Sequence, residues 1–147
     1  AEVWKPFEEQ PLIHTSTFGG NEAACAAAIA ALELLVKEHT ANQANVAGAH
    51  FISGLRDLAE EFPDLIADVR GIGLMLGLEM TSSDVSELFI ANVIEQRVLI
   101  AFALNQPGVI RIEPPLIMPI EVIDEVLQRL KTGLVATQEI FSQFSSS

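Results

Sequence analysis

One ten-residue stretch, "AACAAAIAAL" from Ala23 to Leu32, restricts the possible folds more than any other part of the sequence. Asn21, just before it, is a good N-cap residue, and Glu22 suits the positive end of a helix dipole. We therefore expect a helix that runs from this cap to about Lys37. Ala23–Leu32 is apolar on all sides, and a helix without a polar face needs protein around it in every direction.

Composition supports the idea that part of the covering protein lies elsewhere. The length of 147 residues fits one domain. Half of the residues are hydrophobic and only 19% are charged, against about 25% in an average domain. The chain thus carries more apolar surface than a self-contained domain needs. It also begins with "AEVWKPFEEQ", without a Met, so we expect a piece of a longer protein.

The net charge of −12 excludes several partners. A nucleic-acid-binding protein needs a basic surface, and recruitment to anionic lipids needs clustered Lys and Arg. We expect neither partner. The apolar stretch is too short for a bilayer, which takes about 20 residues, and the N-terminus lacks a signal-peptide pattern. Cys25 is the only cysteine, which fits a cytoplasmic chain without disulfides, and its apolar setting predicts a buried, inert thiol.

The other elements follow from periodicity and turn residues. Prolines and a glycine pair predict that residues 1–20 are irregular. Further helices are expected at 43–61, at 84–96 with Asp84 and Glu87 as a capping arrangement, and from Pro119 onward, with a frayed tail at 142–147. Strands are expected at 65–71, 73–80, 98–103 and 109–112. This order predicts an α+β fold, in which a small, mostly antiparallel sheet carries helices on one face. We place the domain division at 1–40 and 41–147.

The octet "HTSTFGGN" before the first long helix has the composition of an anion site. Ser16 and Thr17 offer hydroxyls, the glycine pair exposes backbone, and a helix start provides a positive dipole end. The alternative is that these hydroxyls only belong to a loop that leads to the helix cap.

Arg111 is the second candidate for ligand binding. In the strand "VIRI", alternation puts Arg111 on the face opposite Ile110 and Ile112. If the isoleucines face the core, the guanidinium points away from it, just before the rigid "EPP" corner. Such a planar fork suits a carboxylate. The alternative is an ordinary surface ion pair, perhaps with Glu113.

Other patterns predict no chemistry. The glycines of "GIGLMLG" do not match a dinucleotide fingerprint, since Leu76 takes the place of its last glycine, and they favour a tight turn between two strands. The histidines have no ligand spacing, and the three lysines lie near the N-terminus or in last helical turns, so we expect no metal site and no catalytic lysine. These residues are His14, His39 and His50, and Lys5, Lys37 and Lys131.

Three motifs in order, "HTSTFGGNEAACAAAIAALELL", "VRGIGLMLGLEM" and "VIRIEPPL", resemble the class-III pyridoxal-phosphate (PLP) aminotransferases of the ornithine and acetylornithine type. The likeness extends from about Leu12 to Ala136. Within the family, the first and last motifs look most like the putrescine aminotransferase branch. The resemblance implies that this chain is the C-terminal part, in which a long helix from an absent large domain leads into a small α+β domain.

The resemblance also implies roles for individual residues. Thr17, helped by Ser16, would bind the PLP phosphate of the neighbouring subunit of a homodimer, with Gly19 and Gly20 letting the backbone turn close to that site. Arg111 would bind the carboxylate of 2-oxoglutarate or of an amino-acid substrate. The family's catalytic lysine lies upstream of these motifs, so the resemblance implies that this chain contains no catalytic residue, is inactive alone and does not hold PLP by itself.

Two alternatives stay open at this point. Some relatives of these enzymes are PLP-dependent aminomutases, decarboxylases or racemases, and the residues that separate them lie outside this chain. A free-standing α+β interaction or regulatory module, derived from such an enzyme, is also compatible with the motifs. The reading frame upstream of Ala1 would separate the module from the enzyme.

Overall fold

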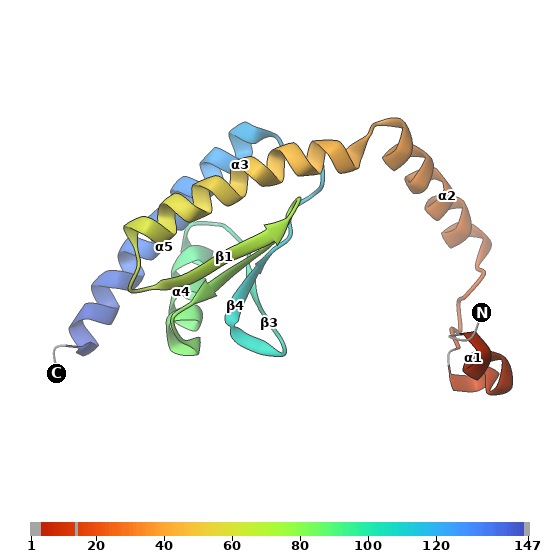
Figure 1. The fold of residues 1–147 in the computed structure, drawn as a ribbon, viewed down its shortest axis with the longest axis horizontal. Helices are drawn as coiled ribbons and strands as arrows, with labels where there is room; N and C mark the ends of the chain where they lie inside the picture. Colours follow the sequence, from red (N-terminus) through yellow and green to blue (C-terminus); the bar gives the residue numbers. More distant parts are fainter. Residues whose placement is uncertain (1–3, 14, 146–147) are drawn as a thin grey trace. The chain divides into compact units, whose positions relative to one another are not determined.

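The computed structural model describes residues 4–13 and 15–145 (Figure 1). The chain divides into two compact units, residues 1–38 and residues 39–147. We call them the N-terminal unit and the C-terminal unit and describe each by itself. Within the described residues, none of the helices is both long enough and apolar enough to cross a membrane.

The N-terminal unit is more regular than expected. Where the sequence predicted only irregular chain, a short helix α1 (Lys5–Glu9) and a 3-10 turn η2 (Pro11–Ile13) form. A proline in the first turn of α1 explains its start, because proline presets the helical φ and no helical bond needs its missing N–H. The rings of Trp4 and Phe7 pack with their centroids 5.2 Å apart.

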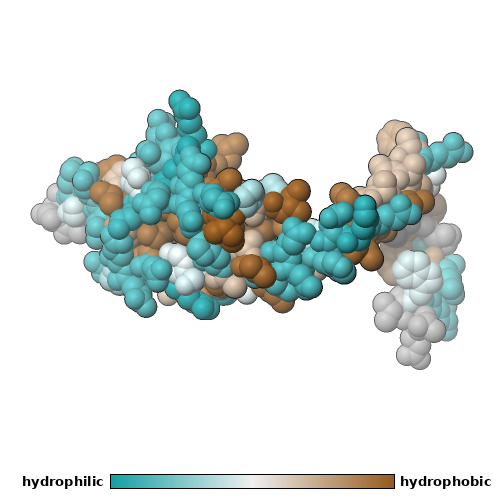
Figure 2. Space-filling view, turned by 90° about the horizontal axis from the view of Figure 1, so that it is seen from above, coloured by the Kyte–Doolittle hydropathy of each residue, from teal (hydrophilic) through white to brown (hydrophobic). Residues whose placement is uncertain are grey.

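The long helix of this unit, α2 (Glu22–Lys37), begins and ends as predicted. The Asn21 side chain accepts a hydrogen bond of 3.1 Å from the backbone N–H of Ala24. No residue of α2 is buried within this chain, and Figure 2 shows tan and brown apolar residues at its surface. Cys25 is therefore exposed, and the prediction of a buried thiol is wrong. The reason is that the described residues of the N-terminal unit form no second long element that could cover the helix.

The C-terminal unit is built on a four-stranded sheet. Its strands have the order β1-β2-β4-β3 and all neighbours are antiparallel. They comprise β1 (Ile66–Ile72), β2 (Met75–Met80), β3 (Ala101–Ala103) and β4 (Gln106–Ile112). The predicted α+β class is confirmed. The boundaries differ from the prediction: β1 is shifted by one residue, β2 begins at Met75 and β3 covers only the end of 98–103. Strand β4 begins earlier than predicted, at Gln106, which pairs with Ala103 of β3.

Three helices accompany the sheet: α3 (Thr40–Glu61), α4 (Ser83–Glu95) and α5 (Ile120–Ser145). Helix α3 begins at Thr40, three residues before its predicted start, and two other predicted ends are wrong. The cap of α4 is Ser82, whose hydroxyl accepts from the N–H of Val85 at 3.2 Å, so the Asp84–Glu87 arrangement is not the cap. Residues 142–145 continue α5 instead of fraying, while residues 146–147 lie outside the described part.

The core lies between the helices and one face of the sheet. Directly paired residues of neighbouring strands share a face, so the row Val69–Leu78–Ile110 marks the covered face, and all three side chains are buried. The helices supply Phe51 and Phe89, both fully enclosed in the same cluster. The expected stripe of α5 is confirmed, with Ile123, Leu130 and Leu134 buried and Val126 and Leu127 packed beside them.

A tight turn between β1 and β2 forms where the glycines predicted it. Gly73 adopts φ +53°, which favours glycine. The turn approaches α3 closely: a Cβ on Gly48 would lie 2.0 Å from the Gly73 carbonyl oxygen. Glycine at position 48 therefore lets the hairpin and α3 pack directly backbone to backbone.

Candidate functional site

The predicted site residues Ser16, Thr17, Gly19 and Gly20 lie in one turn before α2. The N–H of Gly19 donates to the Ser16 carbonyl at 3.3 Å, and the N–H of Asn21 donates to the Phe18 carbonyl at 3.1 Å. A Cβ on Gly19 would lie 3.2 Å from the Ser16 Cβ, and Gly20 has φ +78°. The backbone conformation at position 20 therefore favours glycine, and Gly19 approaches Ser16 closely.

This turn has the chemistry of a phosphate site. Ser16 and Thr17 are exposed, and the turn leads directly into the N-cap of α2. Hydroxyl groups and the positive end of a 16-residue helix are the groups that bind phosphate in many proteins. These residues therefore fit the phosphate end of PLP.

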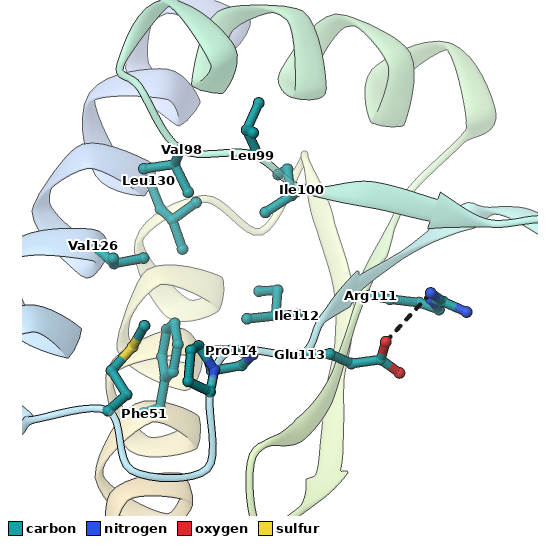
Figure 3. Close-up of a pocket in the computed structure, with 12 residues that line it drawn as sticks. Phe51, Val98, Leu99, Ile100, Arg111, Ile112, Glu113, Pro114, Val126 and Leu130 are labelled. Carbon is teal, nitrogen blue, oxygen red and sulfur yellow. Dashed lines mark ion pairs between the residues drawn. The ribbon is translucent and has the colours of Figure 1, made fainter. Parts of the chain in front are cut away.

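The second predicted residue, Arg111, lies in the C-terminal unit on the face of the sheet opposite the core. Its neighbours Ile110 and Ile112 are buried, as the alternation predicted. In Figure 3, Ile112 points toward Phe51 and Pro114, whereas Arg111 extends away from that apolar cluster. The guanidinium is accessible, with 56% of the side chain exposed.

Glu113 is the ion-pair partner of Arg111. Its carboxylate Oε2 lies 3.3 Å from Nη2 of Arg111, and 46% of its side chain is exposed. That separation is longer than the 2.7–2.9 Å of a strong charge-assisted hydrogen bond. The contact is a loose one that uses a single nitrogen of the guanidinium, so the fork of Arg111 keeps donors that a ligand carboxylate can bind.

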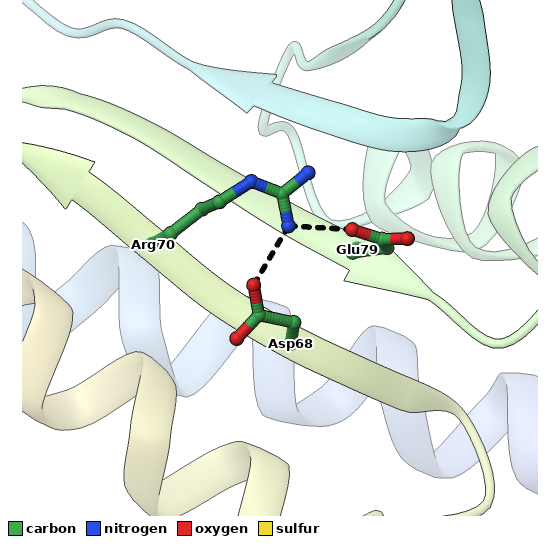
Figure 4. A network of polar contacts seen from close by, with 3 residues as sticks. All are labelled: Asp68, Arg70 and Glu79. Carbon is green, nitrogen blue, oxygen red and sulfur yellow. Dashed lines mark hydrogen bonds and ion pairs between the residues drawn. The ribbon is translucent and has the colours of Figure 1, made fainter.

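The sequence patterns did not identify a second arginine on this face, Arg70. Arg70 of β1 and Arg111 of β4 are both paired with Gly77 of β2, so the three residues form one row across the sheet. Arg70 is held by two carboxylates: its Nη1 donates to Asp68 Oδ2 at 2.7 Å and also to Glu79 (Figure 4). These hydrogen bonds raise the pKa of the Arg70 guanidinium. Only the strand register, which tertiary folding sets, identifies the network.

The covered face of the sheet has an apolar cavity of about 220 Å³ beside Ile112. It is lined mainly by aliphatic side chains of α5, of the segment before β3 and of the "EPP" corner, among them Val98, Ile100, Val126 and Leu130 (Figure 3). Arg111 and Glu113 also line this cavity, and in Figure 3 their charged groups lie away from the aliphatic side chains.

None of the three lysines has a setting that suits a reaction with the aldehyde group of PLP. Lys5 pairs with Glu9, Lys37 with Glu38 and Lys131 with Glu61, all with exposed side chains. A lysine that reacts with an aldehyde needs a desolvated or cationic setting that lowers its pKa.

The two described histidines have different settings. His50 contacts Asp124 at 2.6 Å, His39 precedes α3, and His14 lies outside the described residues. Among the residues that the structure describes, no group of three or more His, Cys, Asp or Glu side chains is arranged to hold a metal ion.

Comparison with known proteins places these features in context. The family model "aminotransferase class-III" matches residues 1–134. Among solved structures, the chain is similar to the ornithine aminotransferase of Toxoplasma gondii, which shows partial occupancy of PLP at its active site. The TM-score is 0.75 and the identity is 31%, over 95% of this chain and 32% of that one.

Two further solved structures are similar at 26% identity. The lysine aminotransferase of M. tuberculosis, in its internal aldimine form, has a TM-score of 0.77 over 84% of this chain and 28% of its own. The ornithine aminotransferase of Plasmodium yoelii has a TM-score of 0.72 over 84% of this chain and 32% of its own. The chain thus spans less than a third of each of these three relatives.

Proposed function

Because this chain belongs to the class-III aminotransferase family, we propose that it is the C-terminal portion of a PLP-dependent transaminase. The reaction proposed for the whole protein moves an amino group from a diamine or ω-amino donor of the putrescine, ornithine or acetylornithine type to 2-oxoglutarate. Similar structures include ornithine and lysine aminotransferases, and both amino acids carry an ω-amino group. The motifs "HTSTFGGN" and "VIRIEPPL" favour the putrescine type within this range.

The observation that carries the proposal is that the Arg111 guanidinium is exposed and only loosely paired. A guanidinium held on a short strand, pointing away from the core and contacted only loosely by Glu113, can bind a carboxylate through two parallel hydrogen bonds. In this role Arg111 holds 2-oxoglutarate in place while the amino group is transferred.

The turn at 16–20 supplies the second part of the proposed site. Ser16 and Thr17 hydrogen-bond the cofactor phosphate of a neighbouring subunit, so the active protein is a homodimer that also needs its own large domain. When bound, PLP stabilises negative charge that develops on the amine carbon. The residues of this chain contribute anion binding at two positions and no proton transfer. We place the enzyme in the cytoplasm.

Arg111→Ala in the full-length protein tests the central assignment. The KM for 2-oxoglutarate should rise about tenfold or more, the size expected when a charged hydrogen-bonding partner is lost. The KM for putrescine should change far less, because putrescine has no carboxylate. Steady-state kinetics with each substrate varied in turn measures both effects, and an equal rise for the two would refute the assignment.

The 147-residue chain alone should have no transaminase activity. Its lysines are exposed and paired with carboxylates, so none should form a stable covalent adduct with PLP. The chain is incubated with PLP, reduced with borohydride and analysed by mass spectrometry. Stoichiometric labelling of one specific lysine would contradict this expectation.

A further inference from the structure

Gly77 stands between Arg70 and Arg111 in their row across the sheet, and it lies in the interior strand β2. Glycine in the middle of a strand costs stability, because it has no side chain to pack and loses more conformational freedom on folding than other residues. Such a glycine often marks a bulge, a tight bend, or a place where a ligand or another backbone approaches closely.

Nothing within the described chain requires glycine at position 77. Its φ is not positive, and β2 pairs with both neighbouring strands without a bulge at this residue. A Cβ at position 77 would lie 3.6 Å from Val109 Cγ1 and 3.8 Å from Arg70 Cγ, which are ordinary van der Waals contacts. In β1, by contrast, a Cβ on Gly71 would lie 2.5 Å from the Met75 carbonyl oxygen. The fold therefore requires Gly71 but not Gly77.

Gly77 lies on the same face of the sheet as the Arg111 guanidinium. It is the direct cross-strand partner of Arg111 on one side, and Ala101 of β3 is the partner on the other. Neighbouring strands lie only about 5 Å apart. A larger side chain at position 77 would therefore take up volume directly beside Arg111, where a ligand approaches its fork.

A ligand explains the glycine better than a second protein segment does. A segment packed closely on Gly77 would also cover the neighbouring Arg111 guanidinium, whose carboxylate partner is 3.3 Å away. Covering a charge without a close partner is costly, whereas a carboxylate ligand brings its own partner charge. We infer that Gly77 is a specificity-determining residue, which keeps the volume beside Arg111 free for the carboxylate end of a substrate. This inference rests on the proposed function of Arg111.

The test is a size series, Gly77→Ala and Gly77→Val, in the full-length protein. The KM for 2-oxoglutarate should rise about threefold with alanine and about tenfold with valine, because each added carbon takes volume that the ligand needs. The KM for putrescine should change far less, since putrescine has no carboxylate to place beside Arg111. Calorimetry with glutarate should show the same order of weakening without catalysis.

The matched control is Gly108→Ala, at another glycine of the same sheet. Gly108 stands two residues before the buried Ile110 in β4, so it lies on the covered face, and its Cβ would be 3.9 Å from the Met80 carbonyl oxygen. This change should alter neither KM nor glutarate affinity. In the 147-residue chain, the urea midpoint of Gly77→Ala should equal or exceed that of the wild type, because alanine replaces a strand glycine without a clash.

The outcomes separate the inference from the proposed function. If Arg111→Ala raises the KM for 2-oxoglutarate but neither change at Gly77 does, the inference is wrong and the proposed function stands. If Arg111→Ala has no effect on 2-oxoglutarate or glutarate, the assignment of Arg111 fails and the inference fails with it. A lower urea midpoint for Gly77→Ala would mean that the fold needs the glycine. A parallel rise of both KM values, with a lower melting temperature of the full-length protein, would mean that another segment packs there. Either result overturns the inference.

Discussion

The helices α2 and α3 follow each other in the chain, yet they contrast in burial. Alanine and leucine dominate α2, and none of its residues is buried. In contrast, α3 mixes polar and apolar residues, and seven of its residues are buried. The burial follows the apolar spacing of Ala44, Ala47, Phe51, Leu55 and Leu58. Hydrophobicity alone therefore does not create a core; an apolar stripe and a partner surface are both needed.

The matched substitutions Leu55→Ala and Leu32→Ala test this contrast directly. Leu55 on α3 is fully buried, and its truncation should lower the free energy of unfolding by about 2–5 kcal/mol through lost transfer energy and a cavity. Leu32 on α2 is 62% exposed, so its truncation in the 147-residue chain should change the free energy of unfolding by less than about 0.5 kcal/mol. Urea denaturation measures both, and equal losses would show that α2 is packed in solution.

Gly48→Ala should produce the next largest effect. In an exposed helix this change would be favourable, because alanine is the better helix former. Here the new Cβ meets the backbone of Gly73 at 2.0 Å, so the free energy of unfolding should fall by about 1–3 kcal/mol.

The control for Gly48→Ala is Gly54→Ala, whose Cβ meets the Leu127 side chain at 2.3 Å. Because that side chain can rotate, the loss should be smaller than the loss at position 48. The comparison therefore distinguishes a backbone clash from a side-chain clash, and a Gly48→Ala chain as stable as wild type would contradict the close approach.

Asn21→Ala should have a smaller effect, and one that is confined to α2. The Asn21 side chain accepts a hydrogen bond from Ala24, and losing such a cap costs about 1 kcal/mol of helix stability. Amide hydrogen exchange should become faster throughout α2 and stay unchanged in α3, because α2 has no buried contact to support it within this chain. Faster exchange in both helices would show that they fold as one unit.

Chemical labelling of Cys25 should have the smallest effect on stability of these changes. It is also the simplest measure of whether α2 is exposed. The thiol is exposed, so a thiol reagent should modify it completely in the folded 147-residue chain, at a rate that low urea does not change. If labelling required global unfolding, α2 would have to be covered. The same measurement on the full-length protein asks whether the proposed large domain and second subunit bury this helix.

Local patterns made most of the fold predictable. The cap at Asn21, the stripe of α5 and the turn at Gly73 depend on neighbours within a few residues, and the structure confirms them. The cap of α4 could not be chosen from sequence alone, because Ser82 and Asp84 both suit a helix start. The family was also recognisable from its motifs. The prediction that Cys25 is buried failed, since covering α2 requires protein outside this unit.

By itself, the sequence determined the α+β class, the turn geometry around Gly19 and Gly20, and the side of β4 on which Arg111 lies. Each of these follows from short-range sterics or strand alternation. Only the tertiary structure decided which charges share a face. It placed Arg70 beside Glu79 and in one row with Arg111, because residues from three strands become neighbours only after their register is formed. That register is why Arg70 is held by Asp68 and Glu79, whereas Arg111 pairs loosely with Glu113.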